Sequence, residues 1–547
     1  MLREIVKTNY KDNYQLIETS LKKAAFIAID AEFSGLVSHS KLKNSLFDSA
    51  AERYLKLKCS IEQFTIFQFG LSIFHYDRDS NKYVADVYSF HTFPCSFGPV
   101  DNRFLCQASS WEFLRAHKFN FNKVAYEGVP FLSNDQEHEI RRQLKDETMF
   151  ANVERSLSYQ DEDVLQAQCS RVSQWLPTAP VDDSIYINIG DSEYCLRYFL
   201  HKEIRSKFKD VWTFQLPSKI QVQKLKREEI RKAKELEGDR LDLELIDSIT
   251  GFAKIFKLLV ALKKPLIGHN LLLDLMILYN QMYQQLPSTY KVFKKELNAL
   301  FPSIMDTKFI SYRVKDILRN QDCWSDNRLD TLYMFLNSAR GKALASFSPA
   351  IEVTDKGGAS CSVENVESHL HEAAWDAFMS GHCFIRMAHY LAIRRLGEGA
   401  LPRPMSRVEH VAAMTEFRNC VNIIRGSVSH MNIGGPEPPS NRPRLLYVVR
   451  LDNNSINLSQ VAAMLAPHSS GSVDVKAHTR ISALVAVPNQ NSARSIIKAF
   501  VKDREYNVVN YFYPLHSSVA TFLWGGLIFS GSFIVTAALV MHIRKSN

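Results

Sequence analysis

Acidic residues at the end of a short apolar segment are the first residues here that could do chemistry. Residues 24–30 form an apolar run that predicts a buried strand, and Asp30 and Glu32 stand at its carboxyl end. Residues two apart on a strand point to the same side, so both carboxylates would face one space. Such a pair can bind divalent cations together with a third or fourth acid, but an Asp-x-Glu pair alone is common in a long chain.

Two further segments carry acids in a similar setting. Gly268-His269-Asn270 follows an apolar strand candidate and precedes a helix in which Asp274 lies among leucines. An acid in an apolar helix is costly unless it is paired or binds a metal. In the helix predicted over residues 371–396, Asp376 follows His371 by five positions, about 140° around an ideal helix. Because the two cannot share one helical face, we expect His371 in the loop or first turn, close to Asp376.

The elements that must position these acids are strands and helices far apart in the sequence. Residues 62–76 and 85–93 predict two strands that complete a meander with the first. Residues 265–268 and 303–310 predict further strands. The acids would then lie where strands end and helices begin.

Length and composition leave room for such a fold and exclude other classes of protein. The chain has 547 residues, 46% of them hydrophobic, which allows about three folded units. Its nine cysteines form no CxxC pair, so neither a zinc ribbon nor a disulfide framework is indicated, and we expect reduced thiols. The net charge of +9 permits a polyanionic partner without proving one.

The carboxyl end of the chain differs from the rest. Residues 519–541 contain no charged side chain. A helix of that length covers about 34 Å, enough to cross a hydrocarbon core of about 30 Å. The segment therefore predicts a single-pass membrane tail anchor that leaves the preceding residues in the cytosol. Anchors for the endoplasmic reticulum and the mitochondrial outer membrane overlap in composition, so the organelle stays open.

Read together, the acidic motifs resemble a known enzyme class. A strand Asp-x-Glu, then Gly-His-Asn with a helical Asp, then His-x4-Asp, resembles the ordered signature of the DEDDh exonucleases. Longer stretches over about residues 1–400 resemble the CAF1/poly(A)-specific ribonuclease family. These stretches are residues 30–35, 52–58, 67–71, 121–124, 268–270, 371–373 and 376–379.

The resemblance implies a fold, an activity and a set of roles. The fold would be α/β, an RNase H-like DEDD exonuclease fold, and the activity metal-dependent 3′→5′ exoribonuclease cleavage that releases 5′-nucleoside monophosphates. Two Mg²⁺ ions per site, with Mn²⁺ as a substitute, would activate water and stabilise the leaving oxygen. The implied metal ligands are Asp30, Glu32, Asp274 and Asp376, and the implied general base is His371. Phe33 could stack on the terminal base, and Asp306 lies in a family-like stretch as a supporting or substrate-contacting residue.

Accessory regions complete the expected organisation. Arg197 and His201 have the Arg-x3-His spacing of an R3H module. A later β-α-β-β-α pattern resembles a degenerate RRM-like α+β domain, whose strand over residues 482–487 has no aromatic ring to stack on a base, which favours a structural or dimerisation role. The expected parts are a nuclease domain over 1–159 and 241–400, an R3H-like insertion over 160–240, a helix and linker over 401–444, the RRM-like domain over 445–510, and the transmembrane helix over 519–541.

The tail anchor narrows the expected function. With this anchor, the chain resembles the membrane-bound, PARN-like branch of the family. That resemblance implies trimming of the 3′ ends of PIWI-bound precursor piRNAs, with a Tudor-type adaptor as partner. A homodimer is a further expectation. One alternative is a poly(A) deadenylase acting on mRNA or small RNA. Another, of a different class, is a non-catalytic, membrane-tethered RNA-binding scaffold.

Overall fold

The protein divides into two compact units. The computed structural model describes residues 2–39, 42–97, 100–146, 148–149, 159–189, 194–318, 323–355, 360–361, 371–397, 401–440 and 442–512. One unit is drawn from Met1–Lys43, Tyr54–Asn422 and His430–Glu437. The other is drawn from Asn44–Arg53, Ile423–Ser429 and the described residues from Pro438 onward.

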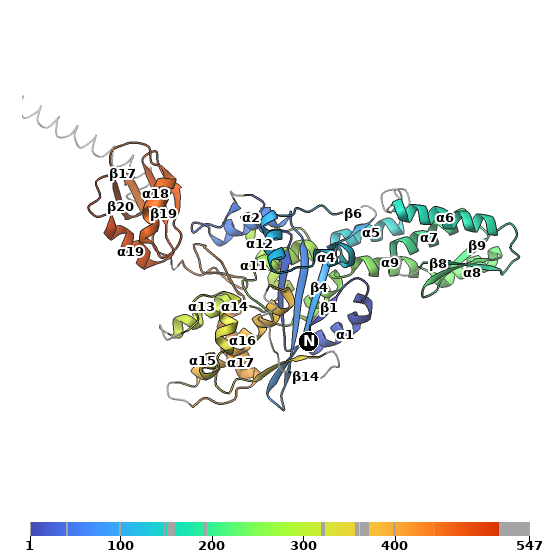
Figure 1. Ribbon diagram of the computed structural model, residues 1–547, viewed down its shortest axis with the longest axis horizontal. Coiled ribbons are helices and arrows are strands. Elements are labelled where there is room, and N and C mark those ends of the chain that lie inside the picture. Colours follow the sequence, from blue (N-terminus) through green and yellow to red (C-terminus); the bar gives the residue numbers. More distant parts are fainter. Residues whose placement is uncertain are drawn as a thin grey trace, which may run out of the picture. The chain divides into compact units, whose positions relative to one another are not determined.

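Three long antiparallel strands form the centre of the first unit (Figure 1). They are β2 (Phe26–Phe33), β3 (Ile66–Asp77) and β4 (Lys82–Pro94), and they pair in chain order as the sequence predicts. Short strands widen the sheet to the order β12-β11-β2-β3-β4-β13-β14, and β1 and β7 also pair with β4. The short strands are Arg3–Ile5 (β1), Val129–Phe131 (β7), Leu266–Gly268 (β11), Ile304–Asp306 (β12), Ala350–Thr354 (β13) and Ser360–Cys361 (β14).

Two of the short strands extend the sheet beyond β2 in parallel. β11 is parallel to β2, and β12 is parallel to β11. The strand predicted over residues 303–310 is wrong beyond Asp306, because α13 (Thr307–Leu318) begins there. The Asp306 carboxylate accepts the backbone N–H groups of Lys308 and Phe309, in the way that an N-cap side chain starts a helix.

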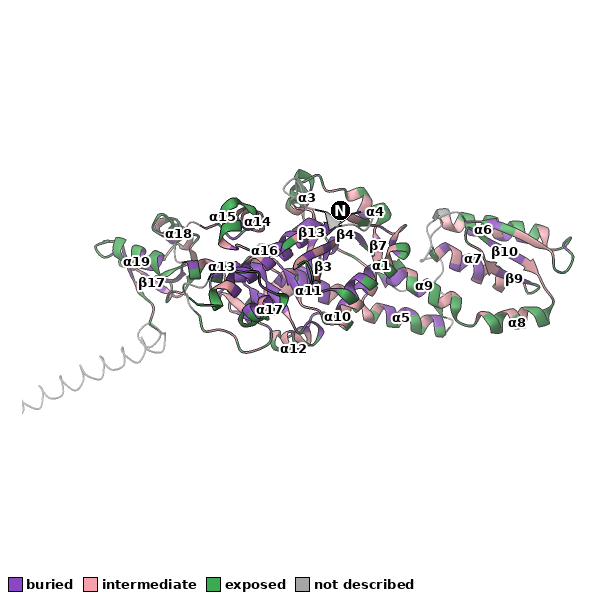
Figure 2. Cartoon of the chain, turned by 90° about the horizontal axis from the view of Figure 1, so that it is seen from below, coloured by how far each residue is buried: buried purple, intermediate pink, exposed green. Residues whose placement is uncertain are grey.

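Alternate residues of β3 face two different helical layers. The helices concerned are α1 (Tyr10–Lys23), α10 (Ala253–Leu262) and α16 (Ala373–Arg395). The ring centroid of Phe69 lies 4.9 Å from that of Phe252, directly before α10, whereas Phe74 stacks at 5.8 Å on Phe378 of α16. Figure 1 shows α1 and α16 on opposite sides of the strands, and Figure 2 shows buried residues concentrated around them. The central strands are therefore covered on both faces.

The insertion forms a small α/β arrangement with a core of its own. A three-stranded antiparallel sheet, in the order β8-β10-β9, packs with two helices around residues such as Val172, Leu200 and Ile220. Its elements are α6 (Tyr159–Trp175), β8 (Ser184–Asn188), α7 (Tyr194–Lys207), β9 (Val211–Gln215) and β10 (Lys219–Lys224). The following helix, α8 (Arg227–Glu237), buries no residue.

The second unit contains a four-stranded antiparallel sheet in the order β18-β19-β17-β20. Two helices cover it around a core that includes Val448, Val485 and Ile496. Its elements are β17 (Leu446–Arg450), α18 (Leu458–Leu465), β18 (Asp474–Ala477), β19 (Ser482–Ala486), α19 (Gln490–Ala499) and β20 (Tyr506–Asn510). The β-α-β-β-α pattern read from the sequence is present, and β20 is a strand that it did not include.

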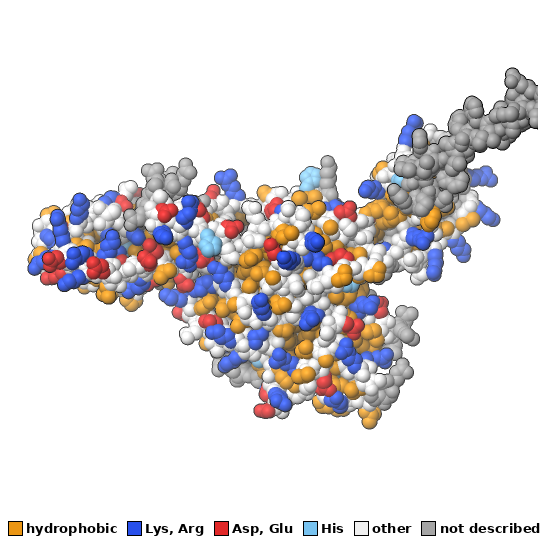
Figure 3. Space-filling view, turned by 180° about the vertical axis from the view of Figure 1, so that it is seen from behind, with side chains coloured by type: hydrophobic (Ala, Val, Ile, Leu, Met, Phe, Trp, Pro, Cys, Tyr) orange, Lys and Arg blue, Asp and Glu red, His pale blue; other side chains and the backbone are white. Residues whose placement is uncertain are grey.

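The predicted tail anchor over residues 519–541 lies outside the described residues. Among the helices that are described, none is both long and apolar enough to span a bilayer. On the surface shown in Figure 3, basic and acidic side chains are interspersed.

Candidate active site

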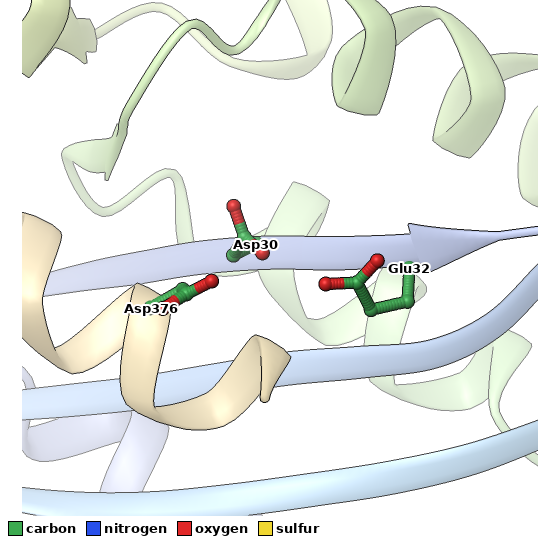
Figure 4. A group of neighbouring side chains, drawn as sticks. All are labelled: Asp30, Glu32 and Asp376. Carbon is green, nitrogen blue, oxygen red and sulfur yellow. The ribbon is translucent and has the colours of Figure 1, made fainter. Parts of the chain in front are cut away.

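Three of the predicted metal ligands meet in one place. Asp30 and Glu32 extend from β2, and Asp376 extends from the first turn of α16 (Figure 4). One carboxylate oxygen from each lies within 4.8 Å of the others. The chain thus brings together acids that are more than three hundred positions apart in the sequence.

These three carboxylates are held in an unfavourable electrostatic setting. Removal from water, and then the charge of Asp376, raises the pKa values of Asp30 and Glu32 well above their usual range. Burial likewise raises the pKa of Asp376 to about 7. Within the described part of the chain, none of the three forms an ion pair with Lys or Arg. The chemistry of these carboxylates fits a divalent cation as their partner.

The fourth predicted ligand lies beside the trio. Asp274 is on α11 (Leu272–Leu278), is only 7% exposed, and accepts a hydrogen bond from the backbone N–H of Ala31, between Asp30 and Glu32. Its charge helps to raise the pKa values of both neighbours, and burial raises its own pKa to about 7. It is not among the three residues whose oxygens lie within 4.8 Å of one another.

A partly buried turn positions the helix that carries Asp274. Asn270 has a left-handed φ of 67°, and a Cβ on Gly268 would come within 2.8 Å of the carbonyl oxygen of Ile29. His269 is fixed from both ring nitrogens, since Nδ1 lies 3.0 Å from the Thr307 hydroxyl and Nε2 lies 3.0 Å from the Asn327 carbonyl oxygen. The Gly-His-Asn motif is therefore a rigid turn at the end of β11.

Asp306 holds this turn and has no exposed surface. Its two oxygens accept five backbone N–H groups, at 2.9 to 3.4 Å, from three separate segments. The donors are Asn270, Leu271, Lys308, Phe309 and Asn422. This geometry fits the supporting role expected of Asp306, whereas contact with a substrate would require an exposed oxygen that the residue does not have in this structure.

His371 lies in the loop that leads into α16, two residues before the helix begins, with a left-handed φ of 66°. Its backbone N–H donates to the Asp376 carboxylate. Its ring centroid lies 4.0 Å from that of His117 and 4.9 Å from that of Phe113. Burial, and then the charge of His117, lowers the pKa of His371. The general-base role stays a prediction, since His371 is not part of the carboxylate trio.

His117 and Phe113 are neighbours of the site that sequence reasoning missed. Phe113 lies in α3 (Ala108–Ala116), and His117 is the residue that directly follows this helix. No spacing in the sequence connects this helix to His371, because the contact arises only from tertiary packing.

Phe33 lies next to the acids, at a break in the strand pairing. The register between β2 and β3 shifts between Glu32 and Phe33, so that Phe33 pairs with Ile66 and leaves Phe67 as an extra residue. Such a bulge bends a strand and redirects its side chains. Phe33 is 8% exposed, and its stacking on a base stays a prediction.

Replacing Asp306 tests its supporting role. Asp306→Asn exchanges one acceptor oxygen for an NH₂ group that faces backbone N–H donors, so we expect it to lower the free energy of unfolding by about 2–3 kcal/mol. Urea unfolding followed by circular dichroism measures this. Asp79→Asn, at an exposed turn, is the control. Equal stability of the two variants would contradict the role.

Replacing Asp30 tests whether the acids repel one another. Asp30→Asn removes one of the crowded charges, so in EDTA it should raise the free energy of unfolding by about 1 kcal/mol. Saturating Mn²⁺ should stabilise the unaltered protein but not the variant. If Mn²⁺ raised the melting temperature of both equally, the carboxylates would not be its ligands.

Comparison with known proteins agrees with this geometry. Residues 5–384 match the CAF1 family ribonuclease domain. The chain is 36% identical over 530 residues to the pre-piRNA 3′-exonuclease trimmer of Bombyx mori, covering 96% of this chain and 97% of that protein. It is 30% identical over 498 residues to the poly(A)-specific ribonuclease PNLDC1 of Mus musculus, covering 90% of each.

Among solved structures, S. pombe Pop2p in its Mg²⁺- and Mn²⁺-bound form matches 71% of this chain and 91% of its own, with 14% identity and a TM-score of 0.33. The family match and the two relatives carry the assignment, and they confirm the expected RNase H-like α/β fold and 3′→5′ exoribonuclease activity. The chain belongs to the CAF1 family of ribonucleases.

Proposed function

We propose that this exoribonuclease requires divalent cations and trims the 3′ ends of PIWI-bound precursor piRNAs. The observation that carries the cation requirement is the trio of Asp30, Glu32 and Asp376, crowded within 4.8 Å and without a Lys or Arg partner among the described residues. An all-oxygen donor set of this kind suits Mg²⁺, with Mn²⁺ as a substitute. The similarity to a relative named as a pre-piRNA trimmer supports the substrate.

The residues would divide the chemistry as follows. Asp30, Glu32 and Asp376, with Asp274 beside them, would hold two divalent cations, which supply charge neutralisation on the phosphate and a nucleophile at neutral pH. His371 would accept the proton of the attacking water. That water oxygen forms the new bond to phosphorus, and the bond from phosphorus to the 3′ oxygen of the preceding nucleotide breaks, which releases a 5′-nucleoside monophosphate.

Neighbouring side chains would orient the RNA. Phe33 would stack on the terminal base, since rings stack on any base without reading its sequence. The ribose 2′-hydroxyl would distinguish RNA from DNA. Asp306 would act indirectly, by keeping the Gly-His-Asn turn and thus Asp274 in place.

The second candidate function is removal of poly(A) tails. The relative from Mus musculus is named a poly(A)-specific ribonuclease, which supports this alternative. A non-catalytic scaffold accounts less well for the site, because unpaired acids crowded away from water are costly and serve no purpose there without a cation.

We also propose a subcellular location for the enzyme. Residues 519–541 would anchor it in the endoplasmic reticulum or mitochondrial outer membrane, with the nuclease on the cytosolic side, where a Tudor-type adaptor would present PIWI-bound RNA. The uncharged length of that segment supports this. A homodimer would be compatible with such an arrangement.

The R3H-like insertion and the RRM-like domain would have mainly structural roles. His201 of the R3H-like spacing has no exposed surface, and its ring nitrogens lie 2.7 Å from the Thr213 hydroxyl and 3.1 Å from Oε1 of Gln215. In the RRM-like sheet, β19 presents no ring, although Tyr447, His478 and Tyr511 have ring centroids 5.6–6.1 Å apart. The burial and contacts of His201 favour a folding role for this residue, and the lack of a ring on β19 favours a structural role for the RRM-like sheet.

Loss of one acid should abolish nucleotide release. Asp376→Asn weakens the cation site directly, so we expect the rate on a 5′-labelled single-stranded RNA with Mg²⁺ to fall at least about a hundredfold. Gel electrophoresis of a time course measures this. The control is Asp12→Asn on the exposed side of α1. Full activity of Asp376→Asn, or activity that persists in EDTA, would refute the proposed site.

A competition between substrates tests the proposed RNA. The full chain in its membrane would be given a PIWI-loaded precursor with an extended 3′ end and free oligo(A) of equal length. We expect faster shortening of the loaded precursor, stopping at the edge of the PIWI protein. Faster shortening of oligo(A) would favour the deadenylase.

A further inference from the structure

One face of β3 meets the start of the helix that carries Asp376. Residues 68, 70 and 72 of β3 alternate with Phe69 and Leu71 and therefore share a face. In the strand pairing Gln68 lies opposite Glu32, Gly70 opposite Asp30, and Ser72 opposite Ala28. Paired residues of neighbouring strands point to the same side, so this face of β3 continues the face of β2 that carries the two acids.

Two of these residues bond to the first residues of α16. Oε1 of Gln68 accepts the backbone N–H of Ala373 at 3.1 Å, and the Ser72 hydroxyl donates to the carbonyl oxygen of Ala374 at 3.1 Å. The first N–H groups of a helix have no partner within the helix, so the Gln68 bond satisfies one of them. Gln68 is 4% exposed and Ser72 is fully buried.

The residue between them allows direct backbone contact. A Cβ on Gly70 would lie 2.0 Å from the carbonyl oxygen of Ala373 and 2.5 Å from the backbone nitrogen of Ala374. Atoms cannot approach so closely, so any side chain at position 70 would push the helix away from the strand. Glycine serves here for close approach and not for its backbone freedom, because Gly70 lies in a strand and its φ is not left-handed.

We propose that Gln68, Gly70 and Ser72 are positioning residues that set the first turn of α16, and with it Asp376, at the distance from Asp30 and Glu32 that divalent cations require. Asp376 follows Ala373 by one turn, so a shift of the helix start moves this carboxylate and leaves the two strand acids in place. Metal sites tolerate only about 0.2 Å in ligand distance. The inference rests on the proposed function, because it assumes that these acids bind the cation.

Mn²⁺ binding to the full chain tests the proposal. Gln68→Met keeps the side-chain length and removes the acceptor, Ser72→Ala removes the donor, and Gly70→Ala adds the obstructing methyl group. Each should weaken Mn²⁺ binding, measured by electron paramagnetic resonance of free Mn²⁺, by about tenfold or more. With saturating RNA, kcat at fixed Mg²⁺ should fall while KM for RNA stays unchanged, since the RNA contacts are not altered.

A matched control distinguishes positioning from general loss of packing. Ser89 lies on β4 opposite Gly70, is fully buried like Ser72, and its hydroxyl forms no hydrogen bond in the described structure. Ser89→Ala should therefore leave Mn²⁺ affinity and kcat unchanged. Gly70→Ala can fail to fold, and Gln68→Met and Ser72→Ala then decide the question, with circular dichroism to show that both are folded.

The possible outcomes separate the two proposals. If the unaltered chain binds Mn²⁺ and cleaves RNA, and folded Gln68→Met and Ser72→Ala match it in Mn²⁺ affinity and kcat, the positioning role is refuted and the proposed function stands. A change in KM for RNA with kcat unaltered would likewise refute the positioning role, and so would an equal loss of Mn²⁺ affinity in Ser89→Ala. If the unaltered chain binds no Mn²⁺ at the site and Asp376→Asn remains active, the proposed function itself fails.

Discussion

The structure depends on holding like charges together where water is scarce. Carboxylates that approach within 4.8 Å repel one another, and their partial removal from water adds to the cost, as the raised pKa values of Asp30, Glu32 and Asp376 reflect. Each acid gains no Lys or Arg partner among the described residues. The surrounding fold must therefore supply the restraint that keeps these carboxylates together.

The restraint comes from a sheet that is packed on both faces. β2 is central, so its two acids have little freedom to move apart. The helix with Asp274 begins at a turn fixed by the buried Asp306, and the helix with Asp376 begins against Gln68, Gly70 and Ser72 of β3. Hydrogen bonds thus hold the start of each of these two helices to the sheet. Such bonds are strong where they are buried, because water does not compete for them. Asp274 and Asp376 both lie in the first turn of their helix, which is the part that these hydrogen bonds hold in place.

Local sequence signals were sufficient for the strands, whereas the acids needed the family resemblance. Apolar runs predicted the three central strands. Asp30 and Glu32 stood out at the end of the first strand, and Asp274 stood out as an acid within an apolar helix after Gly-His-Asn, but neither motif alone indicated a metal site. Local sequence signals failed where a side chain overrides local propensity. Asp306 ends β12 by starting α13, so the strand expected through residue 310 stops four residues earlier. β20 was not recognised, because its residues form a strand through pairing with the distant β17. The contacts of His117 and Phe113 with His371 have no sequence signature, since they arise from the packing of α3 against the start of α16.

The central claim is that Asp30, Glu32 and Asp376, with Asp274 beside them, share divalent cations. The most direct measurement is an anomalous-scattering map from crystals of the protein grown with Mn²⁺. Strong peaks bonded to oxygens of the three clustered carboxylates, next to Asp274, are the expected result. Well-ordered carboxylates that face away from one another, with no shared ion between them, would contradict the account.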